Sequence, residues 1–223
     1  MSDYVRLIIS DLHLGSVTSK ESKIFDLLKS VHFDELILAG DIIDFIKIPT
    51  FTEKTTQIFD YLSRSGKKIV YIIGNHDVAL LPFDGKSVLG IEFAEKYEFK
   101  YANKKYRIVH GHQFETGVIK WRYFMNFLSV LQDWAERTFG WNLATWYVKW
   151  KLRKRKLRSI WDLLKRNEEA DVFIMGHTHT PEVVIWVDKS EKIKTYVNCG
   201  DWVENCTYVL IKDGQLRLKK FDK

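Results

Sequence analysis

The chain has 223 residues, 46% of them apolar, which is enough to bury the core of one large domain. Lys and Arg number 35 against 29 Asp and Glu, and this surplus of six is compatible with an acidic partner without identifying one. The sequence has no apolar run of about 18 residues, the length of a transmembrane helix, and no signal-peptide pattern at its N-terminus, so we expect a cytoplasmic protein. The cysteines, Cys199 and Cys206, form no CxxC pair and are expected to be buried thiols.

Strands that end in polar turns alternate with helices along the first part of the chain. Apolar, β-branched runs predict strands, and apolar residues at helical spacing predict helices. In chain order we predict a strand at 4–9, a helix at 20–30, a strand at 35–39, a helix at 53–64, a strand at 68–73, a helix at 86–96 and strands at 105–109 and 171–175. This order predicts an α/β fold with parallel strands, whose loops after the strand C-terminal ends gather on one rim.

After Pro181 the pattern changes to alternating strands. They are predicted at 183–187, 192–197, 207–211 and 216–220, and we expect them to form a second, more antiparallel sheet. Residues 114–167 have almost no strand character, and their apolar stripes at spacings of three and four predict two or more helices. We interpret 114–167 as a helical cap inserted into a single domain that spans 1–223.

Six of the seven histidines lie in turns that follow predicted strands, and only His32 lies elsewhere. An isolated histidine is most often a core or surface residue, which is our interpretation of His32. The six others stand beside glycine or a carboxylate, and those with an i to i+2 spacing place two side chains on the same side of an extended segment. The candidate metal ligands are Asp11, His13, Asp41, Asn75, His110, His177 and His179. Seven ligands are too many for one ion and about enough for two. Carboxylate, imidazole and amide donors suit manganese, iron or zinc, and the lack of thiolates argues against a structural zinc site.

Five short blocks occur in order along the chain. They are Asp11-Leu12-His13, Gly40-Asp41, Gly74-Asn75-His76-Asp77, His110-Gly111-His112 and Gly176-His177-Thr178-His179. Together they resemble the calcineurin-like metallophosphoesterase superfamily. The resemblance implies a two-sheet β-sandwich flanked by helices in four layers, with a dinuclear metal centre between strand ends. It also implies that one metal is held by Asp11, His13, Asp41 and His179, the other by Asp41, Asn75, His110 and His177, and that Asp41 bridges them.

Such a centre explains hydrolysis of a phosphoester. Two cations about 4 Å apart lower the pKa of a shared water to give hydroxide at neutral pH and hold the ester for in-line attack. Besides Asn75, the catalytic candidates are His76, to stabilise the phosphoryl charge or protonate the leaving oxygen, and Asp77, to orient His76 or the ligands. The alternative for His76 is a supporting hydrogen-bond role. We leave Asp44 and His112 off the ligand list, because helix capping and outer hydrogen bonding explain them.

The segment 114–167 carries the basic charge of the chain. It holds twelve Lys and Arg against four Asp and Glu, so the remainder is near neutral or slightly acidic, and it contains six of the eight tryptophans. A basic amphipathic helix with tryptophan on its other side suits an anionic membrane surface or a lipid-linked phosphate, and the densest charge lies at 149–158. A solvated basic face over a tryptophan-filled core is an equally good interpretation.

A narrower resemblance concerns the cap together with Tyr196-Val197-Asn198-Cys199-Gly200-Asp201-Trp202-Val203-Glu204. Both are similar to the branch that contains UDP-2,3-diacylglucosamine pyrophosphatase, a hydrolase of lipid A biosynthesis that works at the inner face of the membrane. One position departs from that branch, which carries Arg where this chain has His76, the residue of the wider superfamily. The sequence therefore predicts a metal-dependent hydrolase, with manganese as the first candidate, of a phosphodiester or pyrophosphate bond in a lipid-linked or nucleotide-sugar substrate. The alternatives are a metal-dependent nuclease or general phosphodiesterase, whose basic aromatic cap grips single strands, and a non-catalytic scaffold of the same fold.

Overall fold

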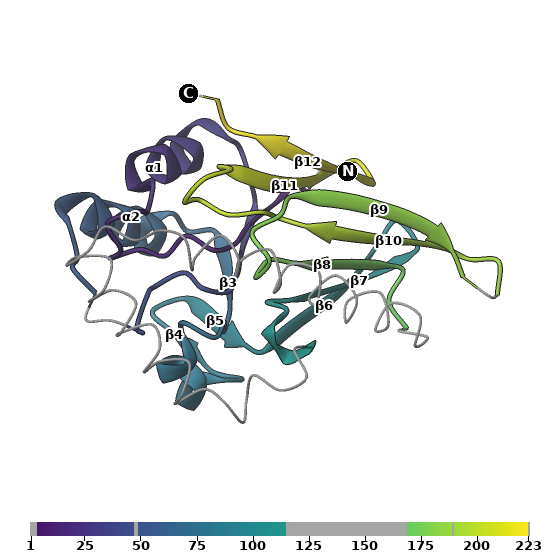
Figure 1. The fold of residues 1–223 in the computed structure, drawn as a ribbon, viewed down its shortest axis with the longest axis horizontal. Helices are drawn as coiled ribbons and strands as arrows, with labels where there is room; N and C mark the ends of the chain where they lie inside the picture. Colours follow the sequence, from purple (N-terminus) through teal and green to yellow (C-terminus); the bar gives the residue numbers. More distant parts are fainter. Residues whose placement is uncertain (1–3, 47–48, 115–168, 189, 223) are drawn as a thin grey trace, which may run out of the picture. The chain divides into compact units, whose positions relative to one another are not determined.

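The computed structural model describes residues 4–46, 49–114, 169–188 and 190–222 (Figure 1). The chain divides into two compact units, residues 1–112 with 169–223 and residues 113–168. The helical cap predicted for 114–167 lies, except for Phe114, outside the described residues. Within the described ranges, no helix is both long enough and apolar enough to cross a lipid bilayer.

The first unit is built on two mixed β-sheets. The larger sheet contains β1 (Arg6–Ile9), β2 (Glu35–Ala39), β3 (Lys68–Ile72), β4 (Ser87–Val88), β5 (Ile91–Ala94), β11 (Thr207–Lys212) and β12 (Gln215–Lys220). Its seven strands run in the order β12-β11-β1-β2-β3-β5-β4. β1, β2, β3 and β5 are parallel neighbours, whereas β4, β11 and β12 are antiparallel to the strands beside them.

The smaller sheet contains β6 (Lys96–Tyr101), β7 (Lys104–Val109), β8 (Val172–Met175), β9 (Glu182–Val187) and β10 (Ile193–Asn198). Its five strands run in the order β6-β7-β8-β10-β9. β7, β8 and β10 are parallel neighbours, and the two outer strands are antiparallel to them. In both sheets the central strands are therefore parallel and end on a common rim.

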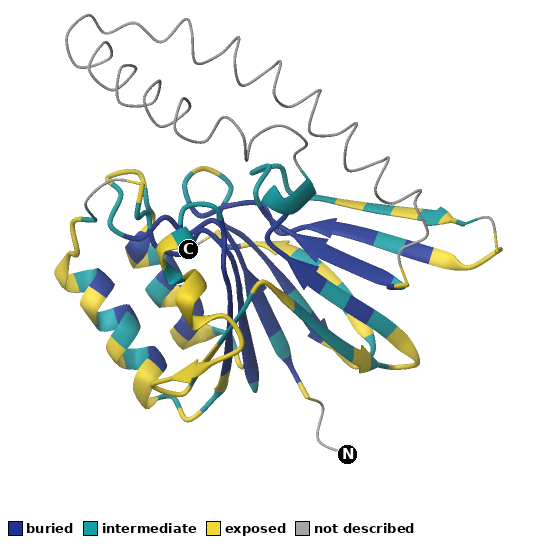
Figure 2. Ribbon diagram, turned by 90° about the horizontal axis from the view of Figure 1, so that it is seen from below, coloured by how far each residue is buried: buried dark blue, intermediate teal, exposed yellow. Residues whose placement is uncertain are grey.

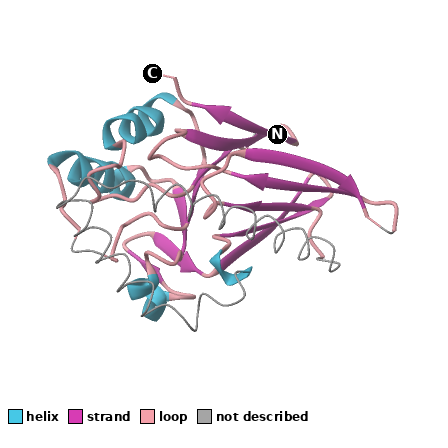
Figure 3. Ribbon diagram, viewed as in Figure 1, coloured by secondary structure: helices cyan, strands magenta, loops and turns pink. Residues whose placement is uncertain are grey.

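Two helices pack on the seven-stranded sheet. α1 (Glu21–Ser30) follows β1, α2 (Glu53–Arg64) follows β2, and the two helices lie side by side (Figure 3). α2 begins at a capping box, in which the side chains of Thr52 and Thr55 each accept a hydrogen bond from the other's backbone N–H. Two short 3₁₀ helices, η1 (Val78–Phe83) and η2 (His112–Phe114), complete the described helices.

Alternation along the central strands divides the interior into two cores. In β1, Leu7 and Ile9 pack with Ile24 of α1, while Ile8 lies between the two sheets with Ile174 of β8. All of these side chains are fully buried, and Figure 2 shows the central strands as the buried part of the unit. A strand that is covered on both faces has to be apolar throughout, which explains why β2 reads Glu-Leu-Ile-Leu-Ala without alternation. The predicted architecture of two sheets with flanking helices is confirmed.

The helix predicted at 86–96 is wrong. The segment forms β4, β5 and the first residue of β6; Gly85 precedes β4 and Gly90 separates β4 from β5, and their φ values of +72° and +80° are incompatible with a helix. β5 pairs in parallel with β3, and Phe93 packs on Tyr71 with ring centroids 5.1 Å apart. Pairing with the edge of a buried sheet therefore overrides the apparent helical spacing.

The strands after Pro181 do not form a sheet of their own. β9 and β10 join the smaller sheet, whereas β11 pairs with β1 and brings β12 to the edge of the larger sheet. The expectation of a second, more antiparallel sheet is therefore wrong in its membership, because both sheets are mixed. Strand positions follow from local sequence, but the choice of partner depends on contacts between residues about two hundred positions apart.

Candidate metal centre

The polar turns predicted from the sequence meet at one rim of the two sheets. β1, β2 and β3 are parallel and in register, and each continues directly into a turn that carries predicted site residues. Backbone hydrogen bonds join neighbouring turns, from Asp11 N to Gly40 O at 3.0 Å and from Gly176 N to His110 O at 3.1 Å. The turns after β7 and β8 are joined in the same way as those after β1 and β2.

Five of the predicted ligands have a left-handed backbone, which is uncommon for residues other than glycine. These residues are Asp11, His13, Asp41, His177 and His179, with φ between 48° and 65°. The conformation costs energy and persists only where surrounding bonds fix it. Two carboxylates provide such bonds, because Asp11 Oδ2 accepts from His177 N at 2.9 Å and Asp41 Oδ1 accepts from His76 N at 2.8 Å.

One donor group consists of Asp11, His13 and His179, each with a ligand atom within 4.8 Å of the others. Nε2 of His179 lies 3.1 Å from Asp11 Oδ1 and 3.4 Å from His13 Nε2. Burial by itself raises the pKa of Asp11, but neighbouring His179 outweighs burial and holds the pKa of this carboxyl well below its usual range. Asp11 is therefore an ionised, fully buried carboxylate.

A second donor group consists of Asp41, His110 and His177, again with donor atoms within 4.8 Å of one another. His110 is fully buried, and its Nδ1 donates to Ala39 O at 3.0 Å, so Nε2 faces the site. That Nε2 lies 3.1 Å from both Asp41 Oδ2 and Asn75 Oδ1. Gly40 packs against the His110 ring so closely that an added Cβ would lie 2.4 Å from Nδ1.

Charge and burial act on the histidines of the site in opposite directions. Burial lowers the pKa of His110, but the Asp41 carboxylate overcomes this effect and raises the pKa to about 9. For His13, burial and the nearby His76 both act downward and lower the pKa to about 4. In the metal-free protein at neutral pH, His110 is therefore protonated and His13 is neutral.

His76 faces the same space from the turn after β3. Its Nδ1 donates to Asp44 Oδ1 at 2.9 Å, and its Nε2 lies 3.8 Å from Asp41 Oδ2. The ring also packs edge-on against His13, with centroids 4.6 Å apart. Burial lowers the pKa of His76, but the bond to Asp44 and the charge of Asp41 raise it above its ordinary value. Sequence reasoning treated Asp44 as a helix cap and missed this contact.

Asp77 is fully buried below the rim. Its Oδ1 accepts from Ile43 N at 2.9 Å and from the Tyr71 hydroxyl at 2.8 Å, and its Oδ2 accepts from Ile42 N and Gly74 N, each at 3.2 Å. These bonds occupy both carboxylate oxygens and tie the turn after β2 to the turn after β3. His112 begins η2, and its ring centroid lies 5.6 Å from that of His110.

A third donor group, His13, Asp41 and His76, shares members with the other two, and all three groups suit a divalent cation. Each group offers a buried carboxylate and two imidazoles, which are the ligands that manganese, iron and zinc accept. Oδ1 of Asp11 is buried and lies 3.1 Å from His179 Nε2 without a hydrogen bond between them, an arrangement that suits two ligand atoms facing one ion. The structure thus brings Asp11, His13 and His179 together, and Asp41, His110 and His177 together with Asn75 beside them.

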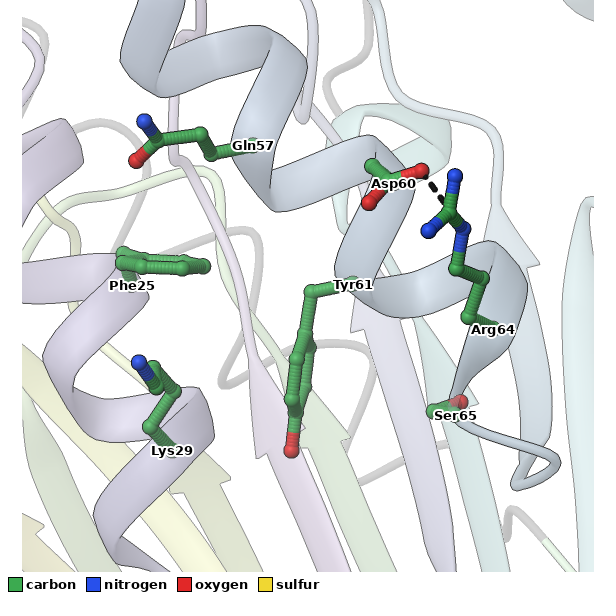
Figure 4. A pocket seen from close by; sticks show the side chains of 7 residues that line it. All are labelled: Phe25, Lys29, Gln57, Asp60, Tyr61, Arg64 and Ser65. Carbon is green, nitrogen blue, oxygen red and sulfur yellow. Dashed lines mark ion pairs between the residues drawn. The ribbon is translucent and has the colours of Figure 1, made fainter.

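Several supporting residues were not predicted. Ser10 Oγ donates to Asp11 Oδ2 at 2.6 Å, and Asn198 and Asn205 bond to the turn that carries His177 and His179. Ser10 and Asn198 stand at strand ends, and Asn198 also lies in the block 196–204 that carries the narrower resemblance, but neither signal predicts these bonds. A separate surface hollow lies between α1 and α2, lined by residues that include Phe25, Tyr61 and Arg64 (Figure 4), and none of its lining residues is a predicted site residue.

Comparisons with known proteins identify the family and support the fold. The family model of calcineurin-like phosphoesterases matches residues 5–181. A UDP-2,3-diacylglucosamine hydrolase of Vibrio cholerae serotype O1 is 24% identical and aligns over 94% of this chain and 95% of its own, and one of Tolumonas auensis is 25% identical over 96% and 95%. Among solved structures, Yfce, a phosphoesterase from E. coli, is 15% identical with a TM-score of 0.51, and the alignment covers 98% of this chain and 93% of that one, which supports the fold.

Proposed function

Because the chain belongs to the calcineurin-like phosphoesterase family and is a hydrolase of phosphoester bonds, we propose that it cleaves a phosphodiester or pyrophosphate bond in a lipid-linked or nucleotide-sugar substrate. The observation that carries the proposal is the pair of three-residue donor groups with the His76–Asp44 pair facing them. Two divalent cations, with manganese as the first candidate and iron or zinc as alternatives, would be held by Asp11, His13 and His179 and by Asp41, Asn75, His110 and His177.

When bound, the two cations would lower the pKa of a water molecule and offset the negative charge of the phosphoryl oxygens. The protein residues fix where this chemistry occurs. Asp41 is central, because its Oδ2 lies 3.1 Å from His110 Nε2 and 3.8 Å from His76 Nε2 while its Oδ1 is held by the His76 backbone. This position suits the bridging role that we propose for Asp41.

His76 is the proposed acid of the reaction. The bond from Nδ1 to Asp44 fixes the ring and favours the protonated form, and Nε2–H, 3.8 Å from Asp41 Oδ2, is the donor proposed to face the substrate. From there His76 can stabilise a phosphoryl oxygen or give its proton to the leaving oxygen. Asp44 then acts through His76, by orienting the ring and holding its proton.

The substrate class is supported by the relatives. The Vibrio and Tolumonas proteins are named UDP-2,3-diacylglucosamine hydrolases, and this chain aligns with nearly their full length. A lipid-linked diphosphate is met at a membrane surface, so the proposal includes peripheral binding to anionic lipid through the basic residues of 149–158. This chain has His76 where that branch carries Arg, so the test also has to establish which leaving groups the enzyme accepts.

A substrate panel tests the proposal. Manganese-loaded and EDTA-treated protein would be compared on UDP-diacylglucosamine, nucleotide diphosphate sugars without acyl chains, aryl phosphomonoesters and diesters, and short single-stranded oligonucleotides. We expect metal-dependent hydrolysis that is fastest on the acylated diphosphate. Oligonucleotides as the best substrates would contradict it in favour of a nuclease, and no hydrolysis with any metal would favour a scaffold.

Variants test the assigned acid. His76→Gln should lower kcat by about 100-fold or more, the scale of general acid catalysis, while the bound metal remains at its wild-type content. His32→Gln is the matched control, because His32 is exposed and lies outside all the site turns. Unchanged kcat in His76→Gln with normal metal content would remove His76 from the mechanism.

A further inference from the structure

The turn after β8 contributes to both donor groups. His177 belongs to the group of Asp41 and His110, and His179 to the group of Asp11 and His13. Both histidines have a left-handed backbone, with φ of 65° and 54°. Each such residue costs about 1–3 kcal/mol and needs surrounding bonds to hold it. The support of this one turn therefore bears on the geometry of the whole centre.

Asn198 supports the turn from the end of β10. β10 is parallel to β8 and in register with it, so Asn198 stands opposite Met175, the last residue of β8. The Asn198 side chain is fully buried, and its Nδ2 donates to Gly176 O at 2.7 Å and to Thr178 Oγ1 at 2.9 Å. These partners are the residues immediately before and after His177.

The other end of the same amide is also engaged. Oδ1 of Asn198 accepts from Gly200 N at 2.9 Å, which fixes the side chain against its own main chain. A carboxylate could not donate to Gly176 O, and an apolar side chain could neither donate nor accept. The contacts therefore require the two functions of an amide, and not merely a buried side chain of this size.

Asn205 contacts the same turn at His179. Its Nδ2 donates to His179 O at 3.0 Å and bonds to Asp201 Oδ2. Asp201 is fully buried, and its Oδ1 accepts from Val203 N and Glu204 N, so it fixes the loop that carries Asn205. Asn205 thus fixes the residue that follows Thr178, whereas Asn198 holds the residues on both sides of His177.

We infer that Asn198 and Asn205 are positioning residues for the metal ligands, Asn198 for His177 and His179 together and Asn205 for His179. This inference rests on the proposed function, because it assigns the two residues to the proposed metal centre. These contacts are made with the turn and not with the substrate: Asn205 acts through the backbone of His179, and Asn198 through the backbone of Gly176 and the hydroxyl of Thr178. The unequal contacts predict unequal effects on the two ions.

Manganese binding to the full chain tests the inference without substrate. Calorimetric titration of the metal-free protein should show two binding steps. Asn198→Ala should weaken both steps by about 10–100-fold, the usual effect of losing a residue that orients a ligand. Asn205→Ala should weaken one step by a similar factor and leave the other unchanged. Electron paramagnetic resonance should show the spin-coupled ion pair of the wild type replaced by single-ion signals at low manganese.

Matched variants separate positioning from stability. The hydroxyl of Tyr196, on β10, is a third and longer acceptor of Asn198 Nδ2, at 3.2 Å, in an equally buried place. Tyr196→Phe removes this acceptor and should leave both steps unchanged, because the two N–H bonds of the amide keep their shorter contacts with Gly176 and Thr178. Thermal unfolding of the metal-free protein shows whether Asn198→Ala folds. If it does not, Thr178→Val is the alternative variant, because it removes only one acceptor of Asn198 Nδ2. It should weaken both steps by about three- to tenfold, the scale of one hydrogen bond.

Two results would overturn the inference. In the first, Thr178→Val binds manganese with wild-type affinity, and Asn198→Ala either does the same or does not fold. The other is an equal loss in Tyr196→Phe. A wild-type protein that binds two manganese ions but hydrolyses nothing in the substrate panel would contradict the proposed function and not this inference. An active enzyme whose variants keep both binding steps would contradict only this inference.

Discussion

Gly40→Ala should destabilise the protein and displace a metal ligand, because two separate costs meet at this residue. Gly40 has a φ of +90°, and a Cβ built there would lie 2.4 Å from Nδ1 and 2.5 Å from Cγ of His110. The His110 ring cannot yield easily, since it is fully buried and its Nδ1 is bonded to Ala39 O. Relief of the clash has to shift Nε2 away from Asp41 and Asn75.

The magnitude follows from a control elsewhere in the chain. Gly66 has a φ of +63°, and no atom lies within 4 Å of a Cβ built there, so Gly66→Ala reports the backbone cost alone. That cost is about 1–2 kcal/mol for a residue with a Cβ in the left-handed region. Gly40→Ala adds an overpacked buried ring, which costs about 1–3 kcal/mol more. We therefore expect the free energy of unfolding to fall by about 2–5 kcal/mol in Gly40→Ala and by about 1–2 kcal/mol in Gly66→Ala.

Urea unfolding of both variants after EDTA treatment measures the two costs, and manganese titration measures the displacement. Gly66→Ala should bind manganese as the wild type does, whereas Gly40→Ala should weaken the step that involves His110. The reasoning from the His110 contact is refuted if the two variants have free energies of unfolding within about 0.5 kcal/mol of each other, the usual error of additivity, and both bind manganese as the wild type does.

Three further predictions concern charge and metal. Asp41 raises the pKa of His110 to about 9, so protonation of His110 stabilises the metal-free fold fully below the unfolded pKa near 6.5, and this stabilisation is lost as the pH rises through about 9. Metal binding between these two pH values should therefore release a proton. A binding enthalpy that does not depend on the ionisation enthalpy of the buffer would contradict this prediction. Asp44→Asn should lower the pKa of His76 and move the alkaline limb of the kcat profile to lower pH, and an unmoved limb would argue against the pair. EDTA should lower the Tm, because ions at 100 times Kd contribute about 2.7 kcal/mol to stability; an unchanged Tm would exclude metal binding to the native state.

Local sequence was sufficient to predict a strand or helix whose apolar pattern depends on its own residues and burial. The prediction at 35–39 coincides with β2, because both faces of that strand are buried and every residue after Glu35 is apolar. The prediction at 53–64 coincides with α2, whose start is marked by Thr52 and Thr55. The segment 86–96 failed because its partner is β3, and pairing across the sheet leaves no signal within eleven residues.

The candidate site shows the same division. Its donor residues are predictable because each stands at the end of an apolar strand, where parallel topology gathers polar groups. Supporting residues such as Asn198 and Ser10 were missed because their bonds reach main-chain or carboxylate atoms of other turns and follow no periodicity. Asp44 was misread for a related reason, since an aspartate after a strand is as typical of a cap as of a histidine partner.

The pairing of β11 with β1 has a consequence for how the chain is made. β1 leads into the turn that carries Asp11 and His13 and leaves the ribosome long before β11, the strand at 207–212 that pairs with its other edge. Until those residues emerge, β1 and β2 form an apolar sheet with an unpaired edge, and such edges recruit other chains. Translation that stops before residue 207 should therefore yield aggregation-prone fragments rather than a weakly active enzyme, and chaperone capture should be strongest for nascent chains just short of that length.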